Sequence, residues 1–347
     1  MKNIQHFYDV SEDLKILYFK DNFMYYYLDV PFLTRILKNL KRKFPILRRI
    51  YDPEKRISHY SLNNDFNLNY CRTYRAAYYN IKKDLPTIIE MHSPNLNDPE
   101  IQGLLKLSKN KNFFGIITIS RLLREKFIHK GVPEKKVLVL DGAVDISRFE
   151  LINESKNKIR KKLHLPLDKK IILYAGSLSK DRGIDTIIKA ANELKNKEYS
   201  FIIIGGKNKQ IKYWTTFMRK KDLNANIFFL GYKQNKIIPS YLKSADILLA
   251  PYSINCITVK WMSPIKIFEY MASGVPIIAS DVKRIKEICN KNECLFFNAD
   301  NPRDLSRKID YLIQNENVQK SLVEKSLTKV KNHTYEKRCK KILEVFS

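Results

Sequence analysis

Residues 263–281 read SPIKIFEYMASGVPIIASD and combine the pattern of a short helix with that of a buried strand after it. Ser263 is suited to cap the helix and Pro264 to occupy its first turn, whereas Gly274 is suited to end it. The run after Gly274 opens with valine and proline and then stays apolar, as expected of a strand covered on both faces. The stretch therefore predicts one helix–strand unit of an α/β sheet.

The same alternation of short apolar runs and helix-length segments extends through the chain. In the first half, the predicted strands are Leu14–Phe19, Thr87–Met91, Gly115–Ile119 and Val137–Leu140. In the second half, they are Ile171–Ala175, Phe201–Ile204, Ile227–Leu230, Ile247–Ala250, Pro276–Ala279 and Cys294–Phe297. Runs that are apolar throughout, rather than alternating, are typical of parallel strands between two layers of helices. The expected fold class is α/β, with two doubly wound parallel sheets.

The 347 residues are enough for two domains, each with its own core. The polar stretch Ile152–Lys170 shows no strand pattern and is the predicted joint. The first domain is therefore expected to span residues 1–152 and the second residues 153–332.

Composition excludes several classes of protein. A hydrophobic fraction of 44% is normal for a folded chain, and no apolar run approaches the roughly 20 residues of a membrane span. The five cysteines form no CxxC pair, so we expect reduced thiols rather than a zinc or disulfide framework. The N-terminus places acids before its short apolar stretch and lacks a small-residue cleavage site, so we expect a cytoplasmic protein.

The net charge of +28 predicts attraction to polyanions, either nucleic acid or an anionic membrane; the alternative is a compositional bias that gives a solvated basic surface. The densest basic stretch, Pro31–Ile50, has seven basic residues and no acid. Its apolar residues fall at helical spacing, which suits a helix lying on anionic lipid headgroups. The alternative is an ordinary amphipathic helix packed on its own sheet. No nucleic-acid-binding motif accompanies the charge, so no nucleic-acid partner is expected.

Residues 174–183 (YAGSLSKDRG) lie at the carboxyl end of a predicted strand, where open parallel sheets bind ligands. Gly176 allows a tight exit from the strand. Lys180 and Arg182 set two cations beside the start of an amphipathic helix, whose first amides also favour an anion. This arrangement predicts a phosphate site.

The 263–281 stretch adds a second set of candidates. The amides of Ile265 and Lys266 are expected to face a further phosphate oxygen. Glu269 lies about one turn inside the helix, where its carboxylate can accept two hydrogen bonds from the cis-diol of a ribose; the alternative is a solvated helix glutamate. Two further candidates lie at predicted strand ends. Gly206 belongs to a Gly-Gly-Lys sequence that is expected to form a turn. Tyr232 follows a strand whose end could offer backbone groups to the nucleotide base.

The order of these motifs resembles the nucleotide-sugar domain of retaining glycosyltransferase family 4, which has the GT-B fold. The resemblance is carried by GSLxxxRG before a helix, then IIIGG, FFLGY, PSYLKSADILLAPY and SPIKIFEYMASGVPIIASD. It is strong over residues 170–300 and looser in the first half, where GVPEKKVLVLDGAVDISRF resembles the family's exit from its first domain. Residues 333–338 (HTYEKR) resemble its closing helix, so residues 333–347 are expected to rejoin the first domain.

The resemblance implies two Rossmann-like domains facing across a cleft, and transfer of a sugar from a nucleotide-diphosphate-sugar donor to an acceptor hydroxyl with retention. It implies no metal and no other cofactor, and no DxD-type triplet lies in a suitable loop. We expect the acceptor to be a glycan or a lipid-linked precursor in cell-surface polysaccharide or glycolipid synthesis, because the chain shows no apolar run long enough for a membrane span but carries the basic stretch Pro31–Ile50. That stretch predicts peripheral contact at the inner face of the cell membrane. The alternatives are a catalytically silent nucleotide-sugar-binding subunit and a basic nucleic-acid-binding protein.

Residue by residue, Arg182 stands where the family has a lysine that grips the donor diphosphate. Ser177 stands where it has an arginine, which leaves Lys180 as a candidate to compensate. Glu269 matches the ribose-binding glutamate. The other glutamate of that family motif, eight residues earlier, is replaced by Trp261.

In the first half, His92 follows the predicted strand Thr87–Met91 and matches the family's histidine that contacts the donor sugar near the anomeric carbon. The alternative is a purely structural histidine. Glu90 is a secondary catalytic candidate that could orient the imidazole or polarise the acceptor hydroxyl. Alternation along the strand is expected to place it on the opposite face from His92.

Overall fold

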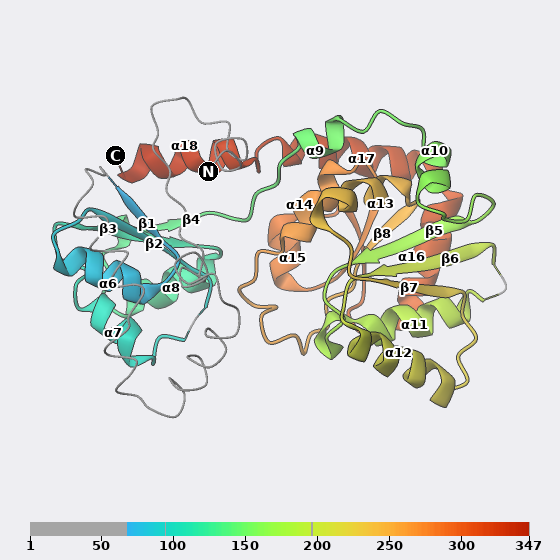
Figure 1. Ribbon diagram of the computed structural model, residues 1–347, viewed down its shortest axis with the longest axis horizontal. Helices are drawn as coiled ribbons and strands as arrows, with labels where there is room; N and C mark the ends of the chain where they lie inside the picture. The colour runs from blue at the N-terminus through green and yellow to red at the C-terminus, as the bar shows by residue number, and fades with distance from the viewer. Residues whose placement is uncertain (1–67, 94, 196, 347) are drawn as a thin grey trace, which may run out of the picture. The chain divides into compact units, whose positions relative to one another are not determined.

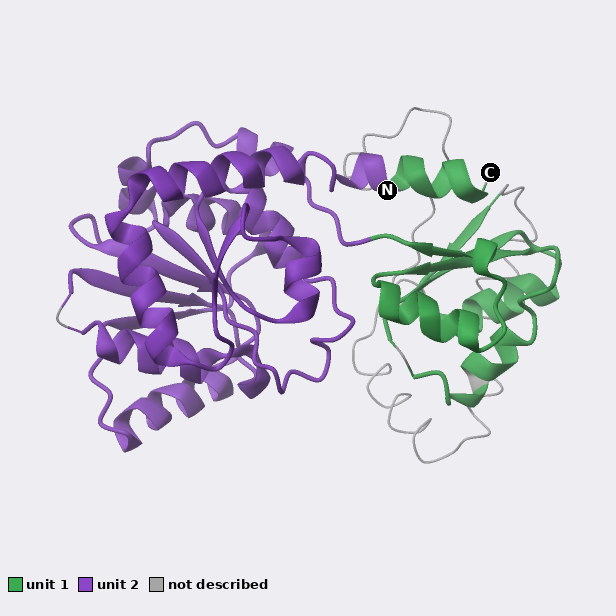
Figure 2. Ribbon diagram, turned by 180° about the vertical axis from the view of Figure 1, so that it is seen from behind, with its two compact units in different colours: residues 1–140, 339–347 green, residues 141–338 purple. Residues whose placement is uncertain are grey.

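The computed structural model describes residues 68–93, 95–195 and 197–346 of the chain. It forms two compact units (Figures 1 and 2). One holds the described residues up to Leu140 together with those from Cys339 onward, and the other holds residues 141–338. Each unit is built on a parallel sheet.

The first unit has a four-stranded sheet in the order β1-β2-β3-β4, with every described pair parallel. The strands are β1 (Asn69–Cys71), β2 (Thr87–Met91), β3 (Phe113–Thr118) and β4 (Val137–Val139). The connecting helices are α6 (Tyr74–Lys82), α7 (Pro99–Leu105), α8 (Arg121–His129) and the 3-10 turn η1 (Glu134–Lys136). The strand β2 is buried at every position, as expected inside a covered parallel sheet.

The last helix, α18 (Tyr335–Phe346), ends in the core of the first unit. The Phe346 ring packs so closely over Gly115 of β3 that a Cβ there would collide with it. Ile342 and Phe346 bury their side chains with Ile88 and Ile117 of the sheet. The end of the chain thereby completes a core whose other residues lie more than 200 positions earlier.

The second unit has a six-stranded parallel sheet in the order β10-β9-β8-β5-β6-β7. The strands are β5 (Lys170–Ala175), β6 (Tyr199–Ile204), β7 (Ile227–Gly231), β8 (Ile247–Ala250), β9 (Ile277–Ser280) and β10 (Cys294–Phe297). From β5 the chain builds outward to β7 and then crosses back to place β8 on the other side of β5. Ligands of open α/β sheets bind at such a reversal, beyond the carboxyl ends of the strands.

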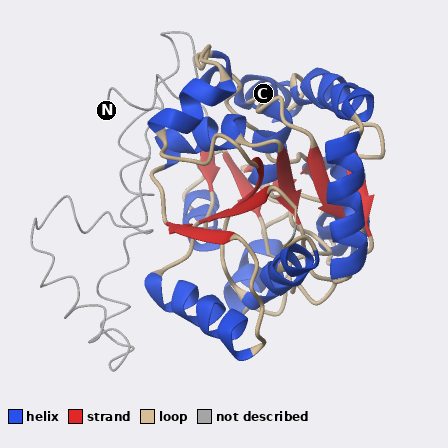
Figure 3. Cartoon of the chain, turned by 90° about the vertical axis from the view of Figure 1, so that its right-hand side faces the viewer, coloured by secondary structure: helices blue, strands red, loops and turns tan. Residues whose placement is uncertain are grey.

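Helices cover both faces of this sheet (Figure 3). They are α9 (Ser147–Glu150), α10 (Lys156–Lys162), α11 (Ile184–Glu193), α12 (Asn208–Lys220), α13 (Ile238–Ser244), α14 (Ile265–Ala272), α15 (Lys283–Ile288), α16 (Pro302–Gln314) and α17 (Glu316–Val330), with 3-10 turns η2 (Lys180–Arg182) and η3 (Asn235–Ile237). Alternate residues of β5 face opposite layers: Ile171 and Leu173 join one core, whereas Ile172 and Tyr174 join the other.

The predicted strands of the described region are confirmed, three of them with identical bounds and the others within two residues at each end. The short β1 was missed, because three residues with an exposed tyrosine at their centre carry no apolar run. The predicted strand Leu14–Phe19 and the basic stretch Pro31–Ile50 lie outside the described residues.

The division between the units differs from the predicted one. Residues 141–152, which we expected in the first domain, belong to the second unit, because Val144 and Phe149 are buried in its core. The predicted joint Ile152–Lys170 contains α10, which packs against α13.

Candidate functional site

Two loops at the reversal of strand order approach each other closely. Gly205 and Gly206 follow β6 with φ values of 116° and 76°, a region that favours glycine. A Cβ at Gly205 would collide with the carbonyl oxygen of Gly176, and one at Gly206 with the side chain of Leu178. Gly206 therefore lies in a tight loop at the end of β6, and the two glycines allow this loop to pack on the loop after β5.

Arg182, in the loop after β5, carries an incompletely compensated positive charge. Its Nε is buried and has no hydrogen-bond acceptor among the described residues. The Asp181 carboxylate lies 3.9 Å from that nitrogen and also accepts a hydrogen bond from Ser179. The guanidinium carbon lies 5.6 Å from the centre of the Tyr252 ring. A buried donor without an acceptor is costly, and a bound anion would supply the acceptor.

Lys266 contributes a second cation from α14. Its Nζ lies 4.0 Å from the centre of the Tyr174 ring and 5.3 Å from that of Tyr252, a cation–π arrangement. Burial and, to a lesser extent, the nearby Arg182 charge lower the pKa of Lys266 to about 7, against the opposing effect of the Glu269 carboxylate. Among the described residues no carboxylate forms an ion pair with Lys266. Two cations with little local compensation suit a ligand with more than one negative charge.

The start of α14 differs from the prediction. Ser263 does not cap the helix: its hydroxyl accepts a hydrogen bond from the amide of Gly142 (2.8 Å) and donates one to Asp141 (3.1 Å). Pro264 occupies the cap position without a side-chain hydrogen bond. Within the described part of the chain, the amides of Ile265 and Lys266 have no acceptor. These amides are oriented as helix N-termini require for binding an anion.

Glu269 does not lie on a solvated helix face, since only 18% of its side chain is exposed. Burial raises the pKa of its carboxyl, and the positive charges of Arg148 and Lys266 oppose that rise. The Arg148 Nη1 atom lies 3.9 Å from Glu269 Oε1. Burial and, after it, the negative charge of Glu269 raise the pKa of the Tyr335 phenol.

The remaining candidates of the second unit lie on its surface. Lys180 places its Nζ 4.7 Å from the centre of the Tyr213 ring on α12, so the structure pairs it with that ring. Ser177 is exposed and its hydroxyl donates to Ser179. Tyr232 follows β7 and is 77% exposed, and Trp261 is half-buried.

The first unit brings Glu90 and His92 into contact. Glu90 is buried, and its Oε1 accepts from both His92 Nε2 and Arg72 Nη1, the latter at 3.1 Å. Arg72 Nη2 lies 3.2 Å from His92 Nδ1. Because arginine only donates, Nδ1 is the acceptor in the contact with Arg72, and Nε2 is the donor to Glu90. The expectation that Glu90 faces away from His92 is wrong, because residues two apart along a strand point to the same side.

Four contributors were not expected from the sequence: the side chains of Arg72, Arg148, Tyr174 and Tyr252. Tyr174 and Tyr252 carry a recognisable signal, since each is an aromatic residue at the end of an apolar strand that leads into a candidate loop. Arg72 and Arg148 carry none, because each meets its partner only through the tertiary fold.

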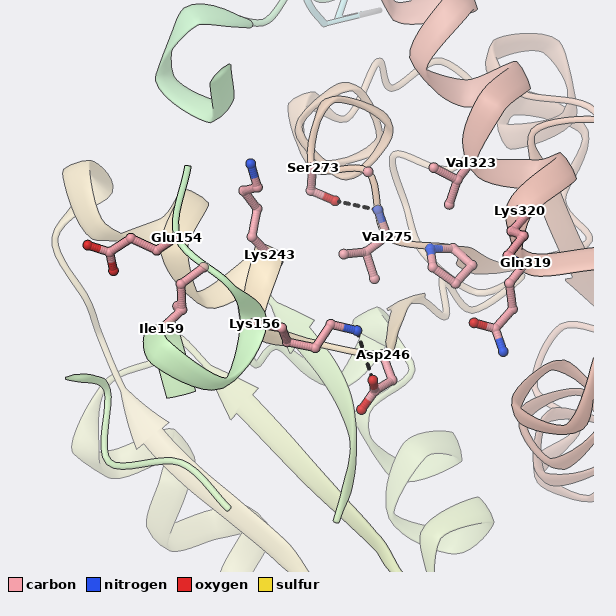
Figure 4. Close-up of a pocket in the computed structure, with 12 residues that line it drawn as sticks. Glu154, Lys156, Ile159, Lys243, Asp246, Ser273, Val275, Gln319, Lys320 and Val323 are labelled. Atoms are coloured by element: carbon pink, nitrogen blue, oxygen red, sulfur yellow. Dashed lines mark hydrogen bonds and ion pairs between the residues drawn. The ribbon is translucent and has the colours of Figure 1, made fainter. Parts of the chain in front are cut away.

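A cavity of about 350 Å³ lies at the other end of the strands (Figure 4). It is lined by Asp246 and Pro276, which directly precede β8 and β9, and by residues of α10 and α17. Lys156 forms an ion pair with Asp246 at 2.9 Å at its edge. Its position at the amino ends of the strands separates it from the candidate site.

The described residues offer neither a metal-binding cluster nor a membrane-spanning helix. No group of three or more His, Cys, Asp or Glu side chains among them is placed to hold a metal ion. No helix in the same region is long and apolar enough to cross a membrane.

The family model described as "Glycosyl transferases group 1" matches residues 155–329, about half of the chain. The chain belongs to this family. This group 1 glycosyltransferase is 30% identical over 181 residues to the amylovoran biosynthesis glycosyltransferase AmsK of Erwinia amylovora, a match that covers 51% of this chain and 42% of AmsK. It is 31% identical over 139 residues to the putative colanic acid biosynthesis glycosyl transferase WcaI of Escherichia coli K12, covering 39% of this chain and 33% of WcaI. The matches thus span less than half the length of these two relatives.

Solved structures show the same fold at low identity. The group 1 glycosyltransferase superposes on Anabaena Alr3699/HepE in complex with UDP with a TM-score of 0.69 and 15% identity, covering 88% of each chain. It superposes on a glycosyltransferase from Rickettsia africae ESF-5 with a TM-score of 0.69 and 17% identity, covering 96% of this chain and 83% of that one. The two parallel α/β units and these similarities show that the chain has the GT-B fold.

Proposed function

We propose that this chain transfers a sugar from a nucleoside-diphosphate sugar to an acceptor hydroxyl, with retention of the anomeric configuration and without a metal. The observation that carries the proposal is the convergence of Arg182 and Lys266 at the carboxyl end of β5. Both cations approach the Tyr252 ring from different elements, and the Nε of Arg182 has no acceptor among the described residues.

A diphosphate meets the requirements of this arrangement. Its charge compensates both cations, and its oxygens accept hydrogen bonds from Arg182 and from the first amides of α14. During transfer the bond from the anomeric carbon to the diphosphate oxygen breaks and its electron pair stays on that oxygen. Preorganised cations and helix amides stabilise this developing charge, which is the role that a metal ion plays in other transferases.

Glu269 supports a nucleoside rather than a bare phosphate ligand. It lies one turn beyond the α14 amides, and its half-buried carboxylate can accept both hydrogens of a ribose cis-diol. Tyr232 and the backbone near Gly206, at neighbouring strand ends, are the proposed surroundings of the base.

In the reaction, the acceptor oxygen bonds to the anomeric carbon on the face from which the diphosphate leaves, and the acceptor proton passes to the departing diphosphate oxygen. His92 is the proposed contact to the reacting sugar, and Glu90 holds its imidazole. Both ring nitrogens are already paired within the first unit, so a nitrogen that contacts the sugar must exchange its present partner.

We further propose an acceptor in cell-surface polysaccharide or glycolipid synthesis, because AmsK and WcaI carry the names of polysaccharide pathways. A lipid-linked acceptor would suit the basic stretch Pro31–Ile50 as a reversible contact to an anionic membrane. Replacement of Lys38, Lys41, Arg42 and Lys43 by Gln should then reduce sedimentation with anionic vesicles at low salt. Wild-type protein that ignores such vesicles would refute the membrane contact.

The decisive experiment incubates the protein with UDP-, GDP- and ADP-sugars and candidate acceptors, with and without a chelator. We expect acceptor-dependent release of one nucleoside diphosphate, unaffected by chelation, and a product whose anomeric configuration by NMR matches the donor. Tight donor binding without turnover would instead support a nucleotide-sugar-binding subunit, for which Trp261 in place of the family's glutamate is the specific observation.

A further inference from the structure

Arg148 holds a place beside Glu269 that neither the sequence motifs nor the family resemblance assigns. It lies on the single turn α9, directly after the chain enters the second unit. Its Nη1 is 3.9 Å from Glu269 Oε1, and its Nη2 donates to the carbonyl of Asn235 at 2.6 Å and to the Asn235 side chain at 3.2 Å. The guanidinium is thus held on one side by the first residue of η3 and lies near α14 on the other.

We infer that Arg148 is a positioning residue that keeps the Glu269 carboxylate ionised and directed toward the ribose of the donor. The inference rests on the proposed function, because it assigns Glu269 to ribose. The carboxylate needs its charge to bind the diol, because an ionised carboxylate accepts from two hydroxyls, whereas a protonated one must donate its own hydrogen.

Among the described charged groups around Glu269, Arg148 is the one that keeps the carboxyl ionised. Among the described residues, the titratable and charged groups that interact with the Glu269 carboxyl are Arg148 from α9, Lys266 and Tyr270 from α14, and Tyr335 from α18. The two tyrosines are neutral at neutral pH, since burial raises the pKa of each. Lys266 loses part of its charge near pH 7 and its ammonium is directed at the Tyr174 ring. Of these four described groups, Arg148 is the one that stays fully charged at every working pH.

The test compares a ribonucleoside diphosphate with its 2′-deoxy analogue. The probe is whichever of UDP, GDP, ADP or CDP binds most tightly, and the readout is the ratio of the two dissociation constants by calorimetry from pH 6 to pH 9. This ratio isolates the contact to the ribose hydroxyl, because the effect of Lys266 on the diphosphate cancels. In the wild type we expect the ratio to stay constant across this range.

In Arg148→Met we expect the ratio to depend on pH. Loss of an opposite charge within about 4–6 Å raises a carboxyl pKa by roughly 1–3 units. Discrimination should therefore fall about tenfold for each unit of pH below the new pKa and recover toward pH 9. Arg148→Lys should restore most of the discrimination. The double variant Glu269→Gln/Arg148→Met should show no pH dependence of the ratio. The control Lys189→Met, which removes an exposed cation of α11, should behave as the wild type.

A second measurement does not need a nucleotide. The titration of the Glu269 carboxyl, followed by NMR with ¹³C-labelled glutamate and assigned by its loss in Glu269→Gln, should move to higher pH in Arg148→Met. A pH-independent ratio or an unmoved titration in that variant overturns the inference, even if donors bind. If the wild type binds no nucleoside diphosphate but the Glu269 titration still moves in Arg148→Met, the proposed function and the ribose assignment are wrong. Only the electrostatic coupling between Arg148 and Glu269 is then supported.

Discussion

The ammonium nitrogen of Lys266 lies 4.0 Å from the centre of the Tyr174 ring, which joins the first turn of α14 to the carboxyl end of β5. The side chain fills the space beside Gly176, where a Cβ would collide with Nζ. Lys266 therefore reaches the loop after β5, beside the position where Ser177 supplies no cation. This contact places two cations, rather than one, at the predicted diphosphate site.

Removing either cation should weaken binding of a nucleoside diphosphate while the fold is kept. A charged hydrogen bond contributes roughly 1.5–3 kcal/mol, so Arg182→Met and Lys266→Met should each lower affinity about 10- to 150-fold by calorimetry. Lys180→Met is the matched control, because Lys180 packs over Tyr213 and should change affinity little. Equal losses in all three variants would contradict a specific role for the pair.

Binding of a nucleoside diphosphate should weaken as pH rises. Since the pKa of Lys266 is about 7 in the unliganded protein, its charge is largely present at pH 6 and largely lost at pH 9. The diphosphate binds the charged form, so affinity should fall by up to about tenfold per pH unit above 7. Lys266→Arg should bind with little pH dependence over the same range. A wild-type affinity that rises with pH would refute the assignment.

Changes at the first unit should affect turnover rather than nucleotide affinity. His92→Ala should reduce kcat steeply while binding of the bare nucleoside diphosphate stays near the wild-type value, because the imidazole acts on the sugar. Glu90→Gln, which keeps the size of the side chain but not its charge, should give a smaller loss of the same kind. A His92→Ala enzyme with near-normal turnover would make His92 a structural residue.

Ser263 should matter for stability and not for binding. Ser263→Ala leaves the Gly142 amide without its acceptor and removes one hydrogen bond to Asp141, whose carboxylate keeps its ion pair with Arg284. This change should cost about 1–2 kcal/mol in the free energy of unfolding measured with urea. The control is Ser177→Ala on the exposed loop after β5, with an expected effect below roughly 0.5 kcal/mol. Loss of nucleotide affinity in Ser263→Ala without loss of stability would indicate instead that the hydroxyl contacts the ligand.

Gly205 should tolerate no side chain. In Gly205→Ala a Cβ meets the carbonyl oxygen of Gly176 at a φ of 116°, so the loop after β6 must shift and both stability and nucleotide affinity should fall. Gly131→Ala is the matched control: its φ is 89°, but no atom lies within 4 Å of the added Cβ. It should cost only backbone strain, about 1 kcal/mol. Similar losses of affinity in both would refute the close approach of the two loops.

The sequence by itself determined the positions of the described strands other than the short β1, and the location of the loops of the proposed donor site. Buried parallel strands are read from runs such as Ile247–Ala250, because a strand covered on both faces must be apolar at every position. Because the strands are parallel, the residues that follow each run lie at the carboxyl edge of the sheet, independently of how the helices pack. This suffices to place Arg182, Lys266 and Glu269 at neighbouring strand ends.

Only the tertiary structure decided what the side chains do there. Arg148 and Glu269 lie about 120 positions apart, as do Ser263 and Gly142, and no local pattern reports such contacts. The hydroxyl of Ser263 could accept a hydrogen bond either from an amide of its own helix or from a distant loop, and the tertiary packing places the Gly142 amide within its reach. Likewise Lys266 could have extended into water, but the absence of a side chain at Gly176 and the faces of Tyr174 and Tyr252 direct its ammonium inward. Local periodicity reports which face of an element is buried, whereas the partner of a polar group depends on which distant segments the fold brings within hydrogen-bonding range.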